Sequence, residues 1–207
     1  TIADIAAAKA GIIKPGCPVV SYGGVPEADA VIARVAKEQN APLTVVDLLR
    51  RAGVECLMVS ADDQDTVTGA RGMEVTMDEK LSEIDDQCDL VVLPGGIPGV
   101  PNLKTNSKVQ AMVKAQNDRG GYVAAICAGP TALGAFGVLA DKNATCYPGC
   151  EDQLMAKRHS TEPVVVDGNV ITSRGVGTAI EFALKLVEIL IDRQTADDLA
   201  EKIVYKR

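Results

Sequence analysis

Cys127 has the setting of a reactive thiol. It follows a short apolar run, Val123 to Ile126, that is typical of a buried strand. Ala128 and Gly129 then allow a strained turn that lifts one side chain above the sheet, beside the amide hydrogens that open the next helix. Those amides and the helix dipole favour a thiolate. The alternative interpretation is a packed structural cysteine at the end of a strand.

Hydrophobic patterns predict the elements that would position this thiol. Strands are expected over 18–22, 54–60, 73–77, 89–94, 123–126 and 144–147, with a hairpin of 164–166 and 170–172. Helices are expected over 1–9, 26–39, 81–84, 106–117, 131–139, 178–192 and 196–203. The segment 43–52 fits a strand in its first half or a helix face, and we prefer a helix in its later part, with a stop at Gly53.

This alternation predicts a doubly wound, mostly parallel α/β sheet with helices on both faces, formed by one domain over residues 1–207. Chemistry in such sheets sits beyond the carboxyl ends of the strands. Three loops occupy such ends: Gly23-Gly24, Gly95-Gly96 and Cys127-Ala128. Their convergence favours the reactive interpretation of Cys127.

Composition excludes several classes of function. The net charge of −7 argues against a nucleic-acid or anionic-membrane binder, and no apolar run is long enough for a transmembrane helix. Six cysteines at irregular spacing, without a signal-peptide pattern, indicate reduced thiols in a cytoplasmic protein. One histidine and no CxxC pair argue against a zinc site, so we expect no metal.

Most of the chain, from about Val45 to the end, closely resembles the ThiJ/PfpI superfamily, in the branch of the parkinsonism-associated deglycase. The resemblance is carried by DLLRRAGV at 47–54, DLVVLPGG at 89–96, AAICAGPTAL at 124–133 and TSRGVGT at 172–178. It implies a flavodoxin-like fold, a homodimer, and Cys127 as the reactive cysteine of a cofactor-independent site.

The resemblance also implies the surroundings of the thiol. The amides of Gly95, Gly96 and Ala128 would form an oxyanion pocket. Arg71 matches an arginine that the family places near this pocket from the partner subunit. Several members carry a histidine where this chain has Tyr147, which donates a hydrogen bond but is a poor base. The one histidine, His159, lies in a polar run and is expected at the surface.

Residues 1–43 resemble a different family, the folylpolyglutamate/dihydrofolate synthases, in the string AKAGIIKPGCPVV at 8–20 and onward from Pro26. No GxxxxGK[ST] phosphate loop is present, which argues against ligase activity. The chain thus has the pattern of a chimera, natural or engineered. The 1–43 segment would supply the first strand and helix to a ThiJ/PfpI-like body over 44–207.

In the ThiJ/PfpI family, the resemblance implies, a glutamic acid forms a hydrogen bond to the reactive sulfur. Its position falls within the 1–43 segment, so the alignment does not fix the identity of this acid. Alignment on Ala30-Val31-Ile32 puts Asp29 in that role, whereas Glu27 keeps the glutamate side chain but not the register. Acids in the first turn of a helix are also ordinary partners of its dipole. Which of the two contacts Cys127 stays open.

Three functions follow from these residues. The first is glyoxalase III or deglycase-like carbonyl chemistry, in which Cys127 attacks an α-oxoaldehyde such as methylglyoxal and lactate is released without a cofactor. The second is a redox sensor or chaperone that responds to oxidative stress through oxidation of Cys127 to a sulfinic acid. The third is a chimeric scaffold that keeps the fold without activity.

Overall fold

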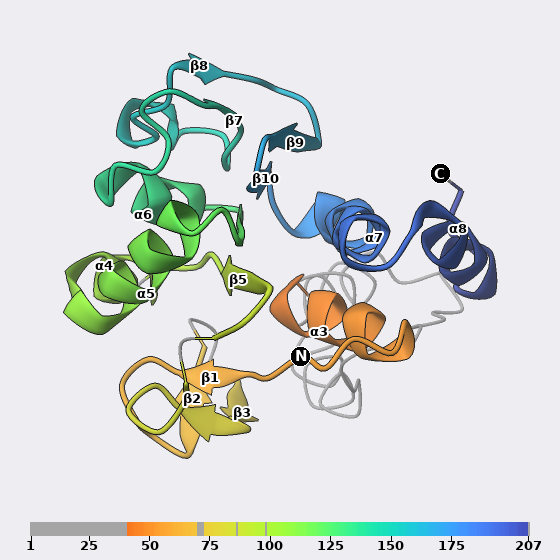
Figure 1. Cartoon of the computed structure of the whole chain (residues 1–207), viewed down its shortest axis with the longest axis horizontal. Coiled ribbons are helices and arrows are strands. Elements are labelled where there is room, and N and C mark those ends of the chain that lie inside the picture. Colours follow the sequence, from red (N-terminus) through yellow and green to blue (C-terminus); the bar gives the residue numbers. More distant parts are fainter. Residues whose placement is uncertain (1–40, 70–72, 86, 98, 207) are drawn as a thin grey trace, which may run out of the picture.

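The computed structural model describes residues 41–69, 73–85, 87–97 and 99–206. A four-stranded sheet forms its centre, in the order β5, β6, β10, β9 (Figure 1). These strands are β5 (Leu90–Leu93), β6 (Tyr122–Ile126), β10 (Val170–Ser173) and β9 (Val164–Asp167). The first three run parallel to one another, and β9 returns antiparallel to β10 as the expected hairpin.

The register brings the carboxyl ends of three strands together. Leu93 of β5 pairs with Ala125 of β6, and Ser173 of β10 pairs with Ile126. The residues that follow β5, β6 and β10 therefore meet at one edge of the sheet. Cys127 lies at the middle of this edge.

Side chains of β6 alternate between two apolar layers, as the pleat of a strand requires. Ala124 and Ile126 pack into the layer under α3 (Ala41–Arg51), α7 (Ala179–Leu190) and α8 (Arg193–Lys202). Val123 and Ala125 pack into the opposite layer, with α4 (Gly99–Thr105), α5 (Ser107–Asp118) and α6 (Pro130–Ala135). Helices thus cover both faces of the sheet (Figure 1), which is the flavodoxin-like arrangement expected from the sequence.

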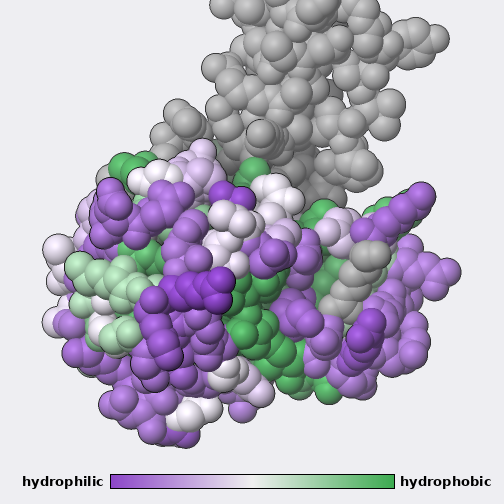
Figure 2. All heavy atoms as spheres, turned by 90° about the horizontal axis from the view of Figure 1, so that it is seen from above, coloured by the Kyte–Doolittle hydropathy of each residue, from purple (hydrophilic) through white to green (hydrophobic). Residues whose placement is uncertain are grey.

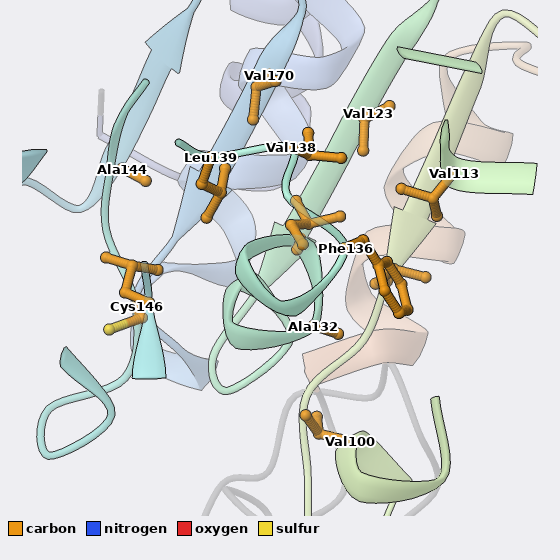
Figure 3. Packing of buried hydrophobic residues seen from close by; sticks show 14 of the residues in the cluster. Val100, Val113, Val123, Ala132, Phe136, Val138, Leu139, Ala144, Cys146 and Val170 are labelled. Carbon is orange, nitrogen blue, oxygen red and sulfur yellow. The ribbon is translucent and has the colours of Figure 1, made fainter. Parts of the chain in front are cut away.

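The layer between the sheet and helices α4, α5 and α6 is filled by side chains that come from distant parts of the chain (Figure 3). Val123 of the central strand is fully buried there, and Phe136 and Leu139 come from the segment after β6. Cys146 is also fully buried in this layer, as an apolar side chain. The segment that follows Cys146 is therefore anchored next to the carboxyl edge of the sheet.

Shorter elements surround this centre. They are the parallel pair β1 (Val59–Ser60) and β4 (Glu79–Lys80), the antiparallel pair β2 (Thr66–Thr68) and β3 (Glu74–Thr76), the parallel pair β7 (Asn143–Ala144) and β8 (Arg158–His159), and the 3-10 turns η1 (Glu151–Gln153) and η2 (Val176–Thr178).

The long elements confirm the patterns read from the sequence. Residues 43–51 are helical as part of α3, so the strand alternative for the first half of segment 43–52 is wrong. Gly53 ends this helix with φ of 87° and donates to the Arg50 carbonyl at 3.0 Å. Asn106 caps α5, since its side-chain oxygen accepts from the amides of Lys108 and Val109.

Several short elements differ from the predictions. The strand expected over 54–60 is reduced to β1, because the Cys56 carbonyl accepts from the Arg50 guanidinium and the Met58 amide donates to the Asp78 carboxylate. Segment 81–84 is a turn rather than a helix. The helix expected over 131–139 ends at Ala135, because Gly137 adopts φ of 82°.

Two other differences concern small strands. Residues 66–68 form β2, for which the hydrophobic pattern predicted no strand. The strand expected over 144–147 is only β7, because the chain then turns toward Cys127. The expected N-terminal elements over 1–39 lie outside the described residues.

The surface is mostly hydrophilic on the face drawn in Figure 2, with an apolar band across its middle. The most exposed large apolar side chains among the described residues include Leu57 and Ile97, at 51% and 71%. No helix in the described ranges has the length and hydropathy needed to cross a membrane.

Substitutions of two valines in the β9–β10 hairpin, one buried and one exposed, test how much the packing of β10 contributes to the free energy of unfolding. Val170 is 1% exposed and Val166 is 47% exposed. We expect Val170→Ala to lower the free energy of unfolding by about 2 kcal/mol, because two buried methyl groups are lost and a cavity remains. Val166→Ala loses the same β-branched group at an exposed position and should cost less than about 1 kcal/mol. Urea unfolding measures both, and equal losses would contradict the assignment.

Candidate functional site

Cys127 occupies a strained bend directly after β6. Its φ is 64°, in the left-handed region that residues with a side chain rarely adopt. Its amide donates to the Ser173 carbonyl at 3.0 Å, at the end of β10. Its carbonyl accepts from the Tyr147 amide at 2.8 Å. Hydrogen bonds from two separate segments therefore hold the backbone of this residue in its unusual conformation.

Two glycines make room for this bend. A Cβ on Gly95 would lie 2.5 Å from the Cβ of Cys127 and 3.0 Å from its sulfur. A Cβ on Gly129 would lie 2.7 to 2.9 Å from the carbonyl oxygens of Leu93, Pro94 and Ile126. These distances are shorter than carbon atoms tolerate, and most of the neighbours are backbone atoms that cannot move aside. Only glycine fits at either position.

The pKa of the Cys127 thiol is raised. Burial is the largest cause, and the nearby Cys150 thiol adds to it. Hydrogen bonds from the amides of Ala128 and Gly96 act in the opposite direction and lower the pKa. Burial outweighs the two amides, so among the described residues the net effect on the pKa is opposite to the thiolate that the sequence pattern favours.

The residues expected to form the oxyanion pocket lie around this sulfur. The amides of Gly96 and Ala128 are directed at it, and Gly95 lies against it with no side chain between them. This arrangement places two hydrogen-bond donors where negative charge would develop on a bound carbonyl compound.

Tyr147 is adjacent to the site through its backbone and through its ring. The amide binds the Cys127 carbonyl, and the ring lies over Gly175, where a Cβ would be 3.4 Å from Cδ2. Half of the side chain is exposed, at 51%. His159, in contrast, is exposed on β8, as expected, and is not among the groups that shift the pKa of Cys127.

Three predicted site residues, Glu27, Asp29 and Arg71, lie outside the described residues. Among the described residues, no carboxylate is one of the groups that shift the pKa of Cys127. In the described part of the chain, no group of three or more His, Cys, Asp or Glu side chains is placed to hold a metal ion.

One neighbour of the site was missed by the sequence reasoning. Cys150 is partly buried and contributes to the raised pKa of Cys127. The sequence reasoning set Cys146 and Cys150 aside because they do not form a CxxC pair. The signal that could have found Cys150 is its place three residues after Tyr147, which the family resemblance had already assigned to the site.

The sheet order, the helices on both faces and the cysteine at the carboxyl edge define a flavodoxin-like α/β protein with a cysteine elbow. Residues 31–189 match the DJ-1/PfpI family, and the chain belongs to this family. The match thus begins within the segment 1–43.

Known relatives support this assignment. The chain is 38% identical over 181 residues to the Parkinson disease protein 7 homolog of Danio rerio, which covers 85% of this chain and 95% of the relative. It is 34% identical over 160 residues to the glutathione-independent glyoxalase DJR-1.2 of Caenorhabditis elegans, covering 76% and 84%. The solved structure of oxidized Toxoplasma gondii DJ-1 superposes with a TM-score of 0.77 at 34% identity, covering 81% and 92%.

The effect of the described residues on the pKa of Cys127 can be measured after both candidate acids are replaced by the corresponding amide residues. We expect the double variant Glu27→Gln/Asp29→Asn to be alkylated at Cys127 with a pH midpoint above the ordinary cysteine value of about 8.5, because burial raises the pKa. The wild-type midpoint should be lower, because a protonated carboxylic acid would donate a hydrogen bond to the thiolate. Single replacements then show which acid acts.

The measurement is the rate of iodoacetamide labelling of the tryptic peptide 120–142, which contains Cys127 as its one cysteine. Cys88 is exposed and precedes β5, whereas Cys127 lies beyond the other end of the sheet, so labelling of Cys88 in the same digest is the internal reference. A midpoint below neutral pH in the double variant would contradict the dominance of burial.

Proposed function

We propose that the chain carries out Cys127-dependent, cofactor-independent chemistry on α-oxoaldehydes and converts methylglyoxal to lactate. The observation that carries the proposal is one thiol on a strained bend with the amides of Gly96 and Ala128 directed at its sulfur. The relative from Caenorhabditis elegans named as a glutathione-independent glyoxalase supports the same class of reaction.

The first step is addition of the Cys127 sulfur to the aldehyde carbon. A C–S bond forms, and the carbonyl π electrons move to oxygen, which becomes the anion of a hemithioacetal. The amides of Gly96 and Ala128, with Gly95 leaving room beside them, are close enough to the sulfur to donate to this oxygen. Protonation of the oxygen completes the hemithioacetal.

The second step is movement of a proton between adjacent carbons. A carboxylate from Glu27 or Asp29 removes the hydrogen from the former aldehyde carbon, which gives an enediolate, and returns it to the neighbouring carbon. The product is a thioester of lactate, and water cleaves it to lactate and the free thiol. Oxidation of one carbon balances reduction of the other, so no external oxidant or reductant is consumed.

Tyr147 and Arg71 complete the proposed binding site. The Tyr147 ring lies over Gly175 beside the bend and is half exposed, so its hydroxyl could donate to the second oxygen of the substrate. Arg71 of the partner subunit would supply positive charge for the enediolate. The chemistry is thus divided between a thiol and amides of one subunit and an arginine of the other.

A cytoplasmic location is part of this proposal. The cysteines of the described residues, Cys56, Cys88, Cys127, Cys146 and Cys150, are all free thiols. Free thiols in this number are typical of a reducing compartment.

Dimer formation is the part of the proposal that sedimentation tests. We expect a single species of about twice the 21.6 kDa chain mass at micromolar concentration, since the family resemblance implies a homodimer and apolar side chains such as Leu57 and Ile97 are exposed. Sedimentation velocity measures the mass. A species of 21.6 kDa alone would remove Arg71 from the proposed site.

Replacement of the thiol tests the activity itself. We expect Cys127→Ser to lower lactate formation from methylglyoxal by at least about 10³-fold, because an alcohol in this site is a far weaker nucleophile than a thiol. Cys88→Ser, at an exposed cysteine remote from the bend, should keep wild-type turnover. Lactate is measured enzymatically after removal of free thiols, which themselves react with methylglyoxal. Turnover that persists in Cys127→Ser excludes the proposed mechanism. If the wild type itself shows no turnover, the proposal is wrong and the protein keeps the fold without this activity.

A further inference from the structure

Two hydroxyl groups lie next to the backbone that supports the bend of Cys127. Ser173 ends β10 and is fully buried, and its carbonyl accepts from the Cys127 amide at 3.0 Å. Thr178 ends η2, and its Oγ1 lies 2.7 Å from the Ser173 Oγ. A pair of hydroxyls therefore joins the residue that supports the cysteine to the segment that leads into α7.

The Ser173 hydroxyl is held from two sides. It donates to the Pro163 carbonyl at 2.9 Å, and the Arg174 amide donates to the same carbonyl at 3.3 Å. Pro163 directly precedes β9. Because the Thr178 hydroxyl lies on the other side of the Ser173 oxygen, the end of β10 is fixed between β9 and η2.

The Thr178 hydroxyl also closes a short loop onto Gly175. The Gly175 amide donates to Thr178 Oγ1 at 3.1 Å, and the same Oγ1 lies 2.9 Å from the Gly175 carbonyl. The Thr178 amide donates to that carbonyl as well, at 2.9 Å. Gly175 is buried, so its amide would lose its partner without this hydroxyl, and an unpaired buried amide is costly.

The loop 173–178 supports the bend through both of the backbone hydrogen bonds of Cys127. The Ser173 carbonyl accepts from the cysteine's amide. The cysteine's carbonyl accepts from the Tyr147 amide, and the Tyr147 ring rests on Gly175, where a Cβ would lie 3.4 Å from Cδ2. One hydroxyl group therefore orders the segment on which both supports depend.

This support matters because the bend is strained. The φ of 64° at Cys127 persists only where the surroundings enforce it. If the bend relaxes, the sulfur moves relative to the amides of Gly96 and Ala128. A displacement of a reacting group by about 1 Å lowers a rate by up to about 100-fold.

We propose that Thr178 is a positioning residue of the Cys127 site, whose hydroxyl holds the loop 173–178 where it fixes the bend of the cysteine. The proposal rests on the proposed function, in which Cys127 is the reacting group. Thr178 makes no bond to the substrate. Its hydroxyl acts through Ser173 and Gly175 and keeps the sulfur aligned with the amides around it.

Thr178→Val tests this role in turnover, because valine keeps the shape of threonine and lacks the hydroxyl. We expect kcat for lactate formation from methylglyoxal to fall at least about tenfold with KM within about twofold of the wild type, since a displaced sulfur reacts more slowly with a substrate that still binds. Thr178→Ser keeps the hydroxyl and should retain at least about half of the wild-type kcat. Thr195→Val removes a hydroxyl from α8 instead and should leave kcat unchanged.

Amide hydrogen exchange, measured by NMR on the reduced 207-residue chain, tests the same role without turnover. In Thr178→Val the Cys127 amide should exchange at least about tenfold faster than in the wild type, because its acceptor, the Ser173 carbonyl, is no longer held. The Val123 amide donates to the Asn169 carbonyl near the other end of β6 and should keep its wild-type rate. Thr178→Ser should protect the Cys127 amide as the wild type does. Circular dichroism shows that each variant is folded.

The proposal requires both changes in Thr178→Val, so a fall in kcat or faster exchange alone overturns it. Equal acceleration of exchange at Val123 and Cys127 also overturns it, since the hydroxyl would then stabilise the sheet in general. A loss in Thr178→Ser as large as in Thr178→Val does so too, because the hydroxyl would not be the group that matters. If the wild type forms no lactate, the carbonyl chemistry fails, and the exchange of the Cys127 amide still decides whether Thr178 holds the bend.

Discussion

The left-handed backbone of Cys127 is the constraint on which the site depends. Such a conformation costs on the order of 1–3 kcal/mol and persists only when neighbouring structure enforces it. Here the enforcement comes from the Ser173 carbonyl, the Tyr147 amide and the absence of a side chain at Gly95 and Gly129. The parallel register of β5, β6 and β10 brings these groups to one edge. The bend therefore exists because the sheet is assembled.

Opposing effects on the sulfur decide what the bend can do. Burial disfavours a charged sulfur, and the amides of Ala128 and Gly96 favour it, with burial the larger. The same burial lowers the local dielectric constant and so strengthens hydrogen bonds to a charged sulfur. The reactivity of such a site depends on the balance between burial of the thiol and the polar groups around it. Cys150 is a neighbour that acts in the same direction as burial, because it also raises the pKa of Cys127.

Long, strongly patterned segments were predictable, and short ones were not. The apolar runs of β5 and β6, the hairpin of β9 and β10, and the amphipathic faces of α5 and α7 carry their own signal. The strands β1 and β4 have two residues each, and they exist only because they pair with each other across twenty positions of sequence. Neither has an apolar pattern of its own, because at most one side chain in each is buried.

The sequence by itself determined the place of the thiol: an apolar strand, Cys127, two small residues and a helix, with Gly95-Gly96 after a neighbouring strand. These features are local, and the preferences of glycine and of buried strands suffice to interpret them. Only the tertiary structure decided that burial outweighs the amides at the sulfur, that Tyr147 binds the cysteine's carbonyl, and that Cys150 is a neighbour. Desolvation and proximity between residues twenty positions apart depend on how the layers pack, and no local pattern of residues encodes that.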